Sequence, residues 1–230
     1  MFERVGVFHF PEGHKTPIPA LEDAISKHPG VRSSLIVLPE AFNNGEVYNG
    51  GDCPPRIPAE LMRSELSAIA KRHSLVFVSG LLHEVAGVIR NSAYLVDGCG
   101  SRLMVHKGAN DDVENPIEIE GVCLGCLICS DARDNRYRVT EKMEGSGLAR
   151  KIVCIPASMS AGTFEGRTLP LAEYRNKYVL MANGKPPYPV GAGSFIANKS
   201  GSKVGGGNFT LPHNTIFLAT WSELDEPAQA

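Results

Sequence analysis

The sequence has no surplus of basic charge. Its 23 Lys and Arg side chains stand against 25 Asp and Glu side chains, which gives a formal net charge of −2 at pH 7. Proteins that hold nucleic acid attract its phosphates with a basic patch. Because the chain has no such patch, we expect no nucleic acid among its partners.

Long apolar runs are missing as well. A helix that crosses a bilayer needs about 20 apolar residues, and no run in this sequence approaches that length. The first residues, MFERVGVFHFPEG, also lack the basic stretch and apolar stretch that together mark a secretory signal. We therefore expect no membrane partner and a cytoplasmic location.

Cysteine is scarce for a chain of 230 residues. Six cysteines are too few for a disulfide scaffold, and three of them lie within one apolar run, so we expect reduced thiols. They are Cys53, Cys99, Cys123, Cys126, Cys129 and Cys154.

The composition that remains is that of a folded protein. Hydrophobic residues make up 43% of the chain and charged residues 21%, which allows a sizeable core and excludes disorder. A chain of 230 residues with no evident linker is expected to form a single domain over residues 1–230.

Short apolar runs alternate with segments of helical spacing, a pattern typical of α/β proteins. The clearest helix is expected over residues 58–73, where apolar side chains form one stripe. Further helices are expected over residues 18–27 and 169–177, and a turn and loop over residues 201–207. Strands are expected over residues 4–10, 35–38, 75–82, 91–96, 102–106, 117–120, 122–129, 151–155, 179–182, 194–197 and 215–220.

Three reactive side chains each follow a predicted strand: Glu40, Lys107 and Cys129. Ligands of α/β sheets gather outside the carboxyl ends of strands, so these groups can meet if the strands run the same way. A carboxylate can take a thiol proton, and a fixed ammonium can stabilise an oxyanion. The combination suits acyl transfer at an amide or nitrile, although each residue alone could equally be an ordinary polar side chain at a strand end.

The spacing of Cys123, Cys126 and Cys129 offers an alternative, because an iron–sulfur sequence can begin in this way. On a strand, however, Cys126 would face away from the other two, which would lie roughly 20 Å apart. The fourth cysteine is also missing, since Arg133 stands in its place. We therefore expect no metal site, and we expect the cysteines other than Cys129 in this region, including Cys154, to fill the core.

The sequence resembles the carbon–nitrogen hydrolase (nitrilase-like) superfamily nearly from end to end. Residues 35–42 (LIVLPEAF) are similar to the family's glutamate motif, residues 103–108 (LMVHKG) to its lysine motif and residues 125–133 (GCLICSDAR) to its cysteine motif. Weaker similarities occur over residues 67–80, 90–100, 172–184 and 191–202.

The resemblance implies an α-β-β-α sandwich of nitrilase type, paired through its helices into a homodimer. It implies that Glu40 is the general base, that Lys107 stabilises the oxyanion and that Cys129 is the nucleophile at a strand-to-helix turn. The backbone N–H of Ser130 would be a second oxyanion donor. The implied reaction converts a small amide or nitrile, with amide favoured, through a thioester and needs neither a metal nor an organic cofactor.

The sequence departs from the family between its lysine and its cysteine. Members usually carry a second glutamate there, but only 21 residues separate Lys107 from Cys129. Glu114 is the first candidate and Glu118 the next, although Glu118 lies on a short strand and more naturally faces solvent.

A rival interpretation remains open because of this short segment: a catalytically silent nitrilase-like protein that binds a ligand or partner. An enzyme needs a Cys129 thiol that is acidified or assisted by a base, whereas a silent relative can keep an inert one. Asp131 and Arg133 could pin the turn after Cys129 by charged hydrogen bonds, or simply begin a solvated helix.

Overall fold

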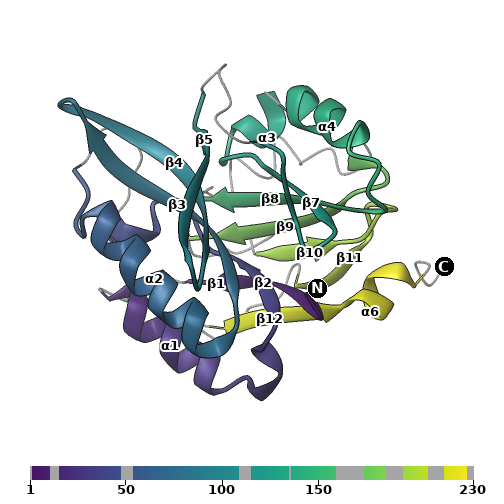
Figure 1. The fold of residues 1–230 in the computed structure, drawn as a ribbon, viewed down its shortest axis with the longest axis horizontal. Coiled ribbons are helices and arrows are strands. Elements are labelled where there is room, and N and C mark those ends of the chain that lie inside the picture. The colour runs from purple at the N-terminus through teal and green to yellow at the C-terminus, as the bar shows by residue number, and fades with distance from the viewer. Residues whose placement is uncertain are drawn as a thin grey trace, which may run out of the picture.

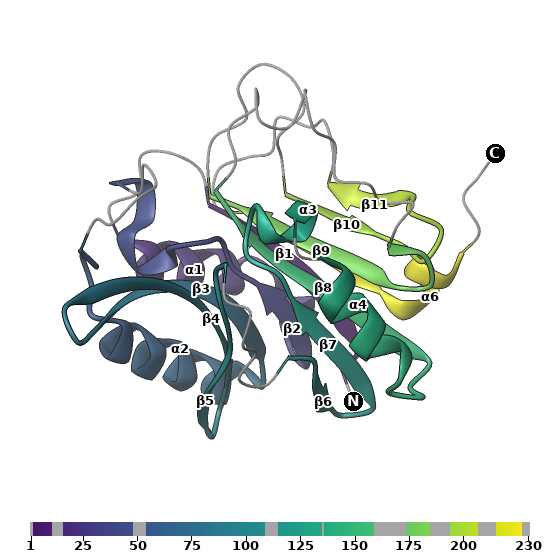
Figure 2. The ribbon, with the colours of Figure 1, turned by 90° about the horizontal axis from the view of Figure 1, so that it is seen from above.

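The strands of this chain form two six-stranded sheets that face each other, with helices on the outer faces (Figures 1 and 2). The structure is a computed structural model. It describes residues 2–10, 16–47, 54–108, 115–134, 136–158, 174–184, 194–206 and 215–226.

The first sheet has the strand order β12-β1-β2-β3-β4-β5. Its strands are β1 (Arg4–His9), β2 (Ser34–Val37), β3 (Val76–Val85), β4 (Val88–Asp97), β5 (Gly100–His106) and β12 (Thr215–Thr220). Strands β1, β2 and β3 are parallel, whereas β4 runs antiparallel to both β3 and β5. Strands β2 and β5 therefore run in the same direction. This is the condition under which Glu40 and Lys107, which follow them, can meet.

The second sheet has the order β11-β10-β9-β8-β7-β6. Its strands are β6 (Ile117–Ile119), β7 (Val122–Cys126), β8 (Arg150–Ala157), β9 (Tyr178–Asn183), β10 (Phe195–Ala197) and β11 (Lys203–Gly206). Strands β7, β8 and β9 are parallel to one another. Among the described residues, the helices are α1 (Pro17–Ser26), η1 (Pro29–Val31), η2 (Phe42–Val47), α2 (Ala59–His73), α3 (Asp131–Asp134), α4 (Arg136–Glu144) and α6 (Trp221–Asp225).

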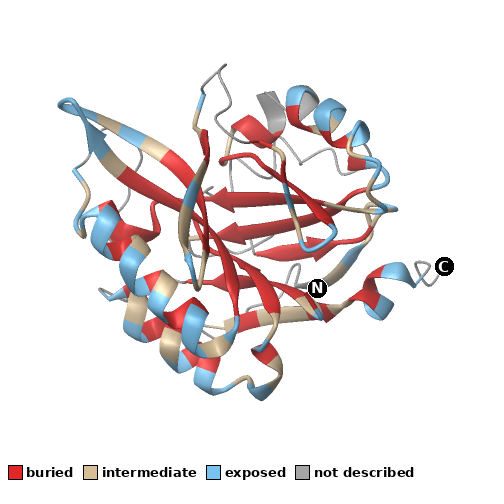
Figure 3. Cartoon of the chain, in the orientation of Figure 1, coloured by how far each residue is buried: buried red, intermediate tan, exposed pale blue. Residues whose placement is uncertain are grey.

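Alternation of side chains along the strands creates separate core layers. On β2, Leu35 and Val37 enter the core between the sheets, whereas Ile36 joins the core beneath α1 and α2. On β8, Cys154 faces the other sheet and Val153 faces α4. Buried residues accordingly run along the strands of both sheets (Figure 3). The expected α-β-β-α sandwich is confirmed.

Most predicted elements are confirmed, but a predicted loop is a strand, one strand is shorter than predicted, and α4 was not predicted. Residues 201–207 were expected to be turn and loop, yet β11 covers Lys203–Gly206 and pairs with β10. The strand expected over residues 122–129 ends at Cys126. The helix expected over residues 169–177 lies mostly outside the described residues.

The prediction that Cys123 and Cys126 lie on opposite faces of β7 is confirmed. Cys126 packs between the sheets, and Cys123 packs on the opposite side, in the core beneath α4. No helix in the described part of the chain is long and apolar enough to cross a membrane.

Candidate active site

Glu40 lies in a turn three residues beyond the end of β2, rather than at the strand end itself. Its backbone N–H donates to the carbonyl oxygen of Ala157, the last residue of β8 in the other sheet (3.3 Å). Its side chain is only 1% exposed. The next residue, Ala41, has a φ of 50°, a left-handed conformation that turns the chain away after the carboxylate.

Cys129 occupies a sharp turn between β7 and the short helix α3. It lies three residues beyond β7, which corrects the expectation that the strand runs up to it. Its backbone N–H donates to the carbonyl oxygen of Pro156 (2.9 Å), and its own carbonyl accepts from Ala132 (3.2 Å). Its φ is 51°, a left-handed conformation that costs about 1 kcal/mol or more for a residue with a Cβ.

The end of β8 therefore holds the backbone of both segments. Pro156 accepts from Cys129, and the next residue, Ala157, accepts from Glu40. Because the two acceptors are adjacent, the carboxylate and the thiol are fixed to one short piece of the second sheet.

Lys107 follows β5 directly and contacts the carboxylate of Glu40. The distance from Lys107 Nζ to Glu40 Oε1 is 2.5 Å. A second donor, Asn91 Nδ2, lies 2.6 Å from the same oxygen. The sequence patterns did not single out Asn91, because it lies within the β4 strand and not at its end. The other oxygen, Glu40 Oε2, is buried and has no hydrogen-bond partner among the described residues.

The Cys129 thiol lies within the electrostatic influence of these groups. The pKa of Cys129 is raised to about 12, chiefly by burial and next by the negative charge of Glu40. The Lys107 ammonium and a hydrogen bond from the backbone N–H of Ser158 act in the opposite direction. At neutral pH the thiol therefore keeps its proton, so attack on a substrate at this pH needs a base to take the proton.

Asp131 connects the lysine segment to the cysteine turn. Its Oδ2 accepts from the backbone N–H of Gly108 at 3.0 Å. This bond supports the interpretation in which Asp131 pins the turn; the side chain of Arg133 lies outside the described residues.

The remaining predicted residues fall in different places. Ser130 follows Cys129 in the turn and is half-buried. Glu118 is exposed on β6. Glu114 lies outside the described residues, so its place in the site stays a prediction.

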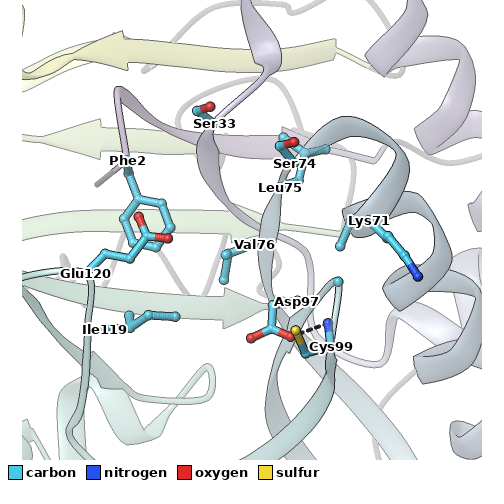
Figure 4. Close-up of a pocket in the computed structure, with 12 residues that line it drawn as sticks. Phe2, Ser33, Lys71, Ser74, Leu75, Val76, Asp97, Cys99, Ile119 and Glu120 are labelled. Carbon is cyan, nitrogen blue, oxygen red and sulfur yellow. Dashed lines mark hydrogen bonds between the residues drawn. The ribbon is translucent and has the colours of Figure 1, made fainter.

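A cavity of about 490 Å³ lies where β2 and β3 begin, at the ends of these strands that are opposite to the candidate site (Figure 4). Ser33 precedes β2, Val76 opens β3, and Cys99 lies in the turn between β4 and β5; all three line this cavity. The residues that line it do not include Glu40, Lys107 or Cys129. Within the described ranges, no group of three or more His, Cys, Asp or Glu side chains could hold a metal ion.

Solved structures match this chain over nearly its whole length. A mutant of the Nesterenkonia AN1 amidase from the nitrilase superfamily aligns with a TM-score of 0.65 and 18% identity, over 96% of this chain and 90% of that chain. A CN-hydrolase superfamily protein from Xanthomonas campestris, with an arsenic adduct in its active site, aligns with a TM-score of 0.70 and 12% identity, with the same coverage of 96% and 90%. The fold is that of the nitrilase superfamily.

Two further matches show how this nitrilase fold is used elsewhere. A double mutant of the amidase from Nesterenkonia sp. AN1 is in complex with acrylamide (TM-score 0.66, 18% identity, 94% and 88% of the two chains). A glutamine-dependent NAD⁺ synthetase from Acinetobacter baumannii matches over 99% of this chain but 48% of its own (TM-score 0.63, 16% identity). No protein-family model and no curated protein matches the sequence.

Proposed function

We propose that this chain is a carbon–nitrogen hydrolase of the nitrilase superfamily that cleaves small non-peptide amides. Cys129 is the nucleophile, Glu40 the general base and Lys107 the stabiliser of the oxyanion. The products are a carboxylic acid and ammonia or an amine, and the reaction needs neither a metal nor an organic cofactor.

One observation carries the proposal. Lys107 Nζ contacts Glu40 Oε1 at 2.5 Å, although the two are 67 positions apart in the sequence, and the charges of both act on the Cys129 thiol. The Glu40 side chain is 1% exposed, whereas that of Lys107 is 28% exposed. A buried carboxylate beside a thiol that keeps its proton suits a general base, and a partly exposed ammonium can reach a substrate oxygen.

The chemistry follows from these positions. Cys129 Sγ attacks the amide carbon as its proton passes to Glu40, and the carbonyl electron pair moves onto oxygen. Lys107 and the backbone N–H of Ser130 stabilise that oxyanion. When the C–N bond breaks, Glu40 returns the proton to the leaving nitrogen. Water then attacks the thioester, with Glu40 as its base, and releases the acid and the Cys129 thiol.

The proposal extends to features that the described residues do not test. We propose Glu114 as the second glutamate, which orients Lys107 and helps to place the substrate. We also propose a homodimer paired through helix layers, in a cytoplasmic environment that keeps Cys129 reduced. Sedimentation that shows a monomer at working concentration would contradict the dimer.

The test is release of ammonia from short aliphatic amides such as propionamide, with propionitrile for comparison. We expect the parent protein to hydrolyse at least one amide. Glu40→Gln and Cys129→Ser should lower kcat by about 10² to 10⁴-fold, because each removes a group that acts on the reacting atoms. Cys99→Ser, at the exposed cysteine beside the distant cavity, is the matched control and should keep full activity.

A trapping experiment separates the proposal from the alternative of a catalytically silent binding protein. During turnover, mass spectrometry should find an acyl group on Cys129, and added hydroxylamine should yield a hydroxamate. A protein that is stabilised by amides but releases no ammonia and acquires no acyl group would be the silent binding protein instead.

A further inference from the structure

We propose that Asn91 is a positioning residue: with Lys107 it holds one oxygen of Glu40, so that the other oxygen is left to accept the Cys129 proton. This inference rests on the proposed hydrolase function and adds a residue that the trio does not include.

One donor lies on β4, and the other directly follows the neighbouring strand β5. Asn91 lies on β4, opposite Leu82 of β3, and its carbonyl accepts from the backbone N–H of Lys107 at 2.8 Å. This backbone bond brings the two side chains to the same place. Asn91 Nδ2 and Lys107 Nζ then reach Glu40 Oε1 at 2.6 Å and 2.5 Å.

The arrangement leaves the two carboxylate oxygens in different environments. Oε1 has two donors, whereas Oε2 is buried and has no hydrogen-bond partner among the described residues. A carboxylate oxygen can accept more than one hydrogen bond, and a buried one without a donor is costly. Such a cost is tolerated at a site where the free oxygen has a role, and transfer of a proton from Cys129 is the role available here.

An amide suits the second donor position for a physical reason. Without Asn91, the Glu40 Oε1 oxygen would be held only by the flexible Lys107 side chain, which must also be able to reach the substrate oxygen. The Asn91 amide carries no net charge, so it restrains the carboxylate without competing with that ammonium for the developing oxyanion. A catalytic group held by a supporting hydrogen bond stays in productive geometry, and a displacement of about 1 Å can cost about 10²-fold in rate.

The test compares the rate of Cys129 alkylation by iodoacetamide at pH 8.5 in four proteins: the parent, Glu40→Gln, Asn91→Leu and the double variant. The rate follows the thiolate fraction, and Cys99 in each sample is the internal standard. Because the charge of Glu40 raises the pKa of Cys129, Glu40→Gln should speed alkylation about tenfold or more. Asn91→Leu should speed it too, since the released carboxylate no longer stays beside the thiol, and should add nothing in the Glu40→Gln background.

Amide hydrolysis supplies the second readout. Loss of Asn91 should lower kcat about 10 to 100-fold with KM within about twofold, because the substrate does not touch Asn91. Asn91→Ala deletes the same donor without adding an apolar side chain, and the same results are expected if the leucine variant does not fold. Asn198→Leu is the control: it removes a buried amide that accepts from Ser200 and Ser202 in the β10–β11 turn and should leave both readouts unchanged.

The outcomes are distinguishable. If Glu40→Gln speeds alkylation but neither Asn91 variant does, Asn91 is not a positioning residue and the hydrolase proposal stands. If Asn91→Leu speeds alkylation equally in the Glu40→Gln background, it acts on access to the thiol, and the inference is wrong. If Glu40→Gln itself leaves Cys129 unchanged, the base assignment fails and the inference fails with it.

Discussion

Gly80 on β3 packs directly behind the catalytic base of the proposed site. A Cβ added there would lie 2.9 Å from Glu40 Cα and 3.1 Å from Pro156 Cβ. Real Cβ atoms do not approach backbone this closely, so any side chain at Gly80 would displace Glu40 or the β8 end that holds Cys129. The absence of a side chain at Gly80 is thus part of what allows the two segments to meet.

Gly80→Ala should therefore impair both stability and catalysis. Overpacking of this kind costs about 1 to 3 kcal/mol, and displacement of the base should lower kcat more than about tenfold. Urea unfolding and amide hydrolysis measure the two effects. Gly145→Ala is the matched control. A Cβ added at Gly145 would lie 3.5 Å from the carbonyl oxygen of Lys142, which is an ordinary van der Waals distance. Loss of stability with unchanged kcat would show that Gly80 does not position Glu40.

The sequence singles out the charged and nucleophilic residues of the proposed site but not the residues that support them. Glu40, Lys107 and Cys129 stand out because all three follow apolar runs and their side chains are chemically complementary. Asn91 and Gly80 lie inside strand patterns, where an amide or a glycine has no distinctive spacing. Their roles depend on which distant backbone approaches them, and only the folded chain supplies that information.

At the scale of elements, α4 is joined to the second sheet by one acidic side chain and two lysines. Glu144 Oε2 lies 2.9 Å from Lys151 Nζ, and Glu144 Oε1 contacts Lys177 Nζ. Lys177 is 3% exposed, so its ammonium has little water to replace a lost partner. Hydrogen bonds from Lys177 and then Lys151 lower the pKa of Glu144.

Glu144→Gln should consequently destabilise the protein at pH 7 by about 1 kcal/mol, with screening at the half-exposed carboxylate keeping the loss this small. A carboxyl whose pKa is lower in the folded state stabilises the protein above its unfolded pKa, and this contribution is lost as the pH falls through the folded pKa. The difference in unfolding free energy between parent and variant should therefore shrink from pH 7 to pH 3. Glu141→Gln, an exposed change on the same helix, is the control. A difference in unfolding free energy between parent and Glu144→Gln that does not depend on pH would contradict the stabilising role of the Glu144 carboxylate.

The elements that the sequence missed have weak side-chain signals. Among the α4 residues whose burial the structure describes, the buried apolar ones are Val139 and Met143, too few to mark a helix in the sequence. Strand β11 ends in two glycines, of which Gly206 pairs with Phe195, and it shows no apolar alternation. By contrast, α2 was predictable because Met62, Leu66 and three further buried residues recur at helical spacing.

At the scale of the whole molecule, the only tryptophan of the chain joins parts that are far apart in sequence. Trp221 opens α6, and its indole N–H donates to the carbonyl oxygen of Phe2 at 2.7 Å. Its ring packs edge-on against Tyr178 of β9 (5.4 Å between centroids), and the Arg150 guanidinium of β8 lies 4.2 Å from the ring centroid. Trp221 thus contacts the N-terminal segment, which leads into the first sheet, and two strands of the second.

We predict from this arrangement that residues 1–230 unfold as one domain. Side chains of both sheets form one core, so neither sheet can separate without exposing apolar surface of the other. Urea unfolding followed by Trp221 fluorescence, which reports contact between the sheets, should coincide with unfolding followed by circular dichroism, which reports secondary structure. Leu35→Ala in this core should move both transitions to lower urea together, by about 2 to 5 kcal/mol. A fluorescence change that precedes the loss of secondary structure would instead show that the sheets come apart before either one unfolds.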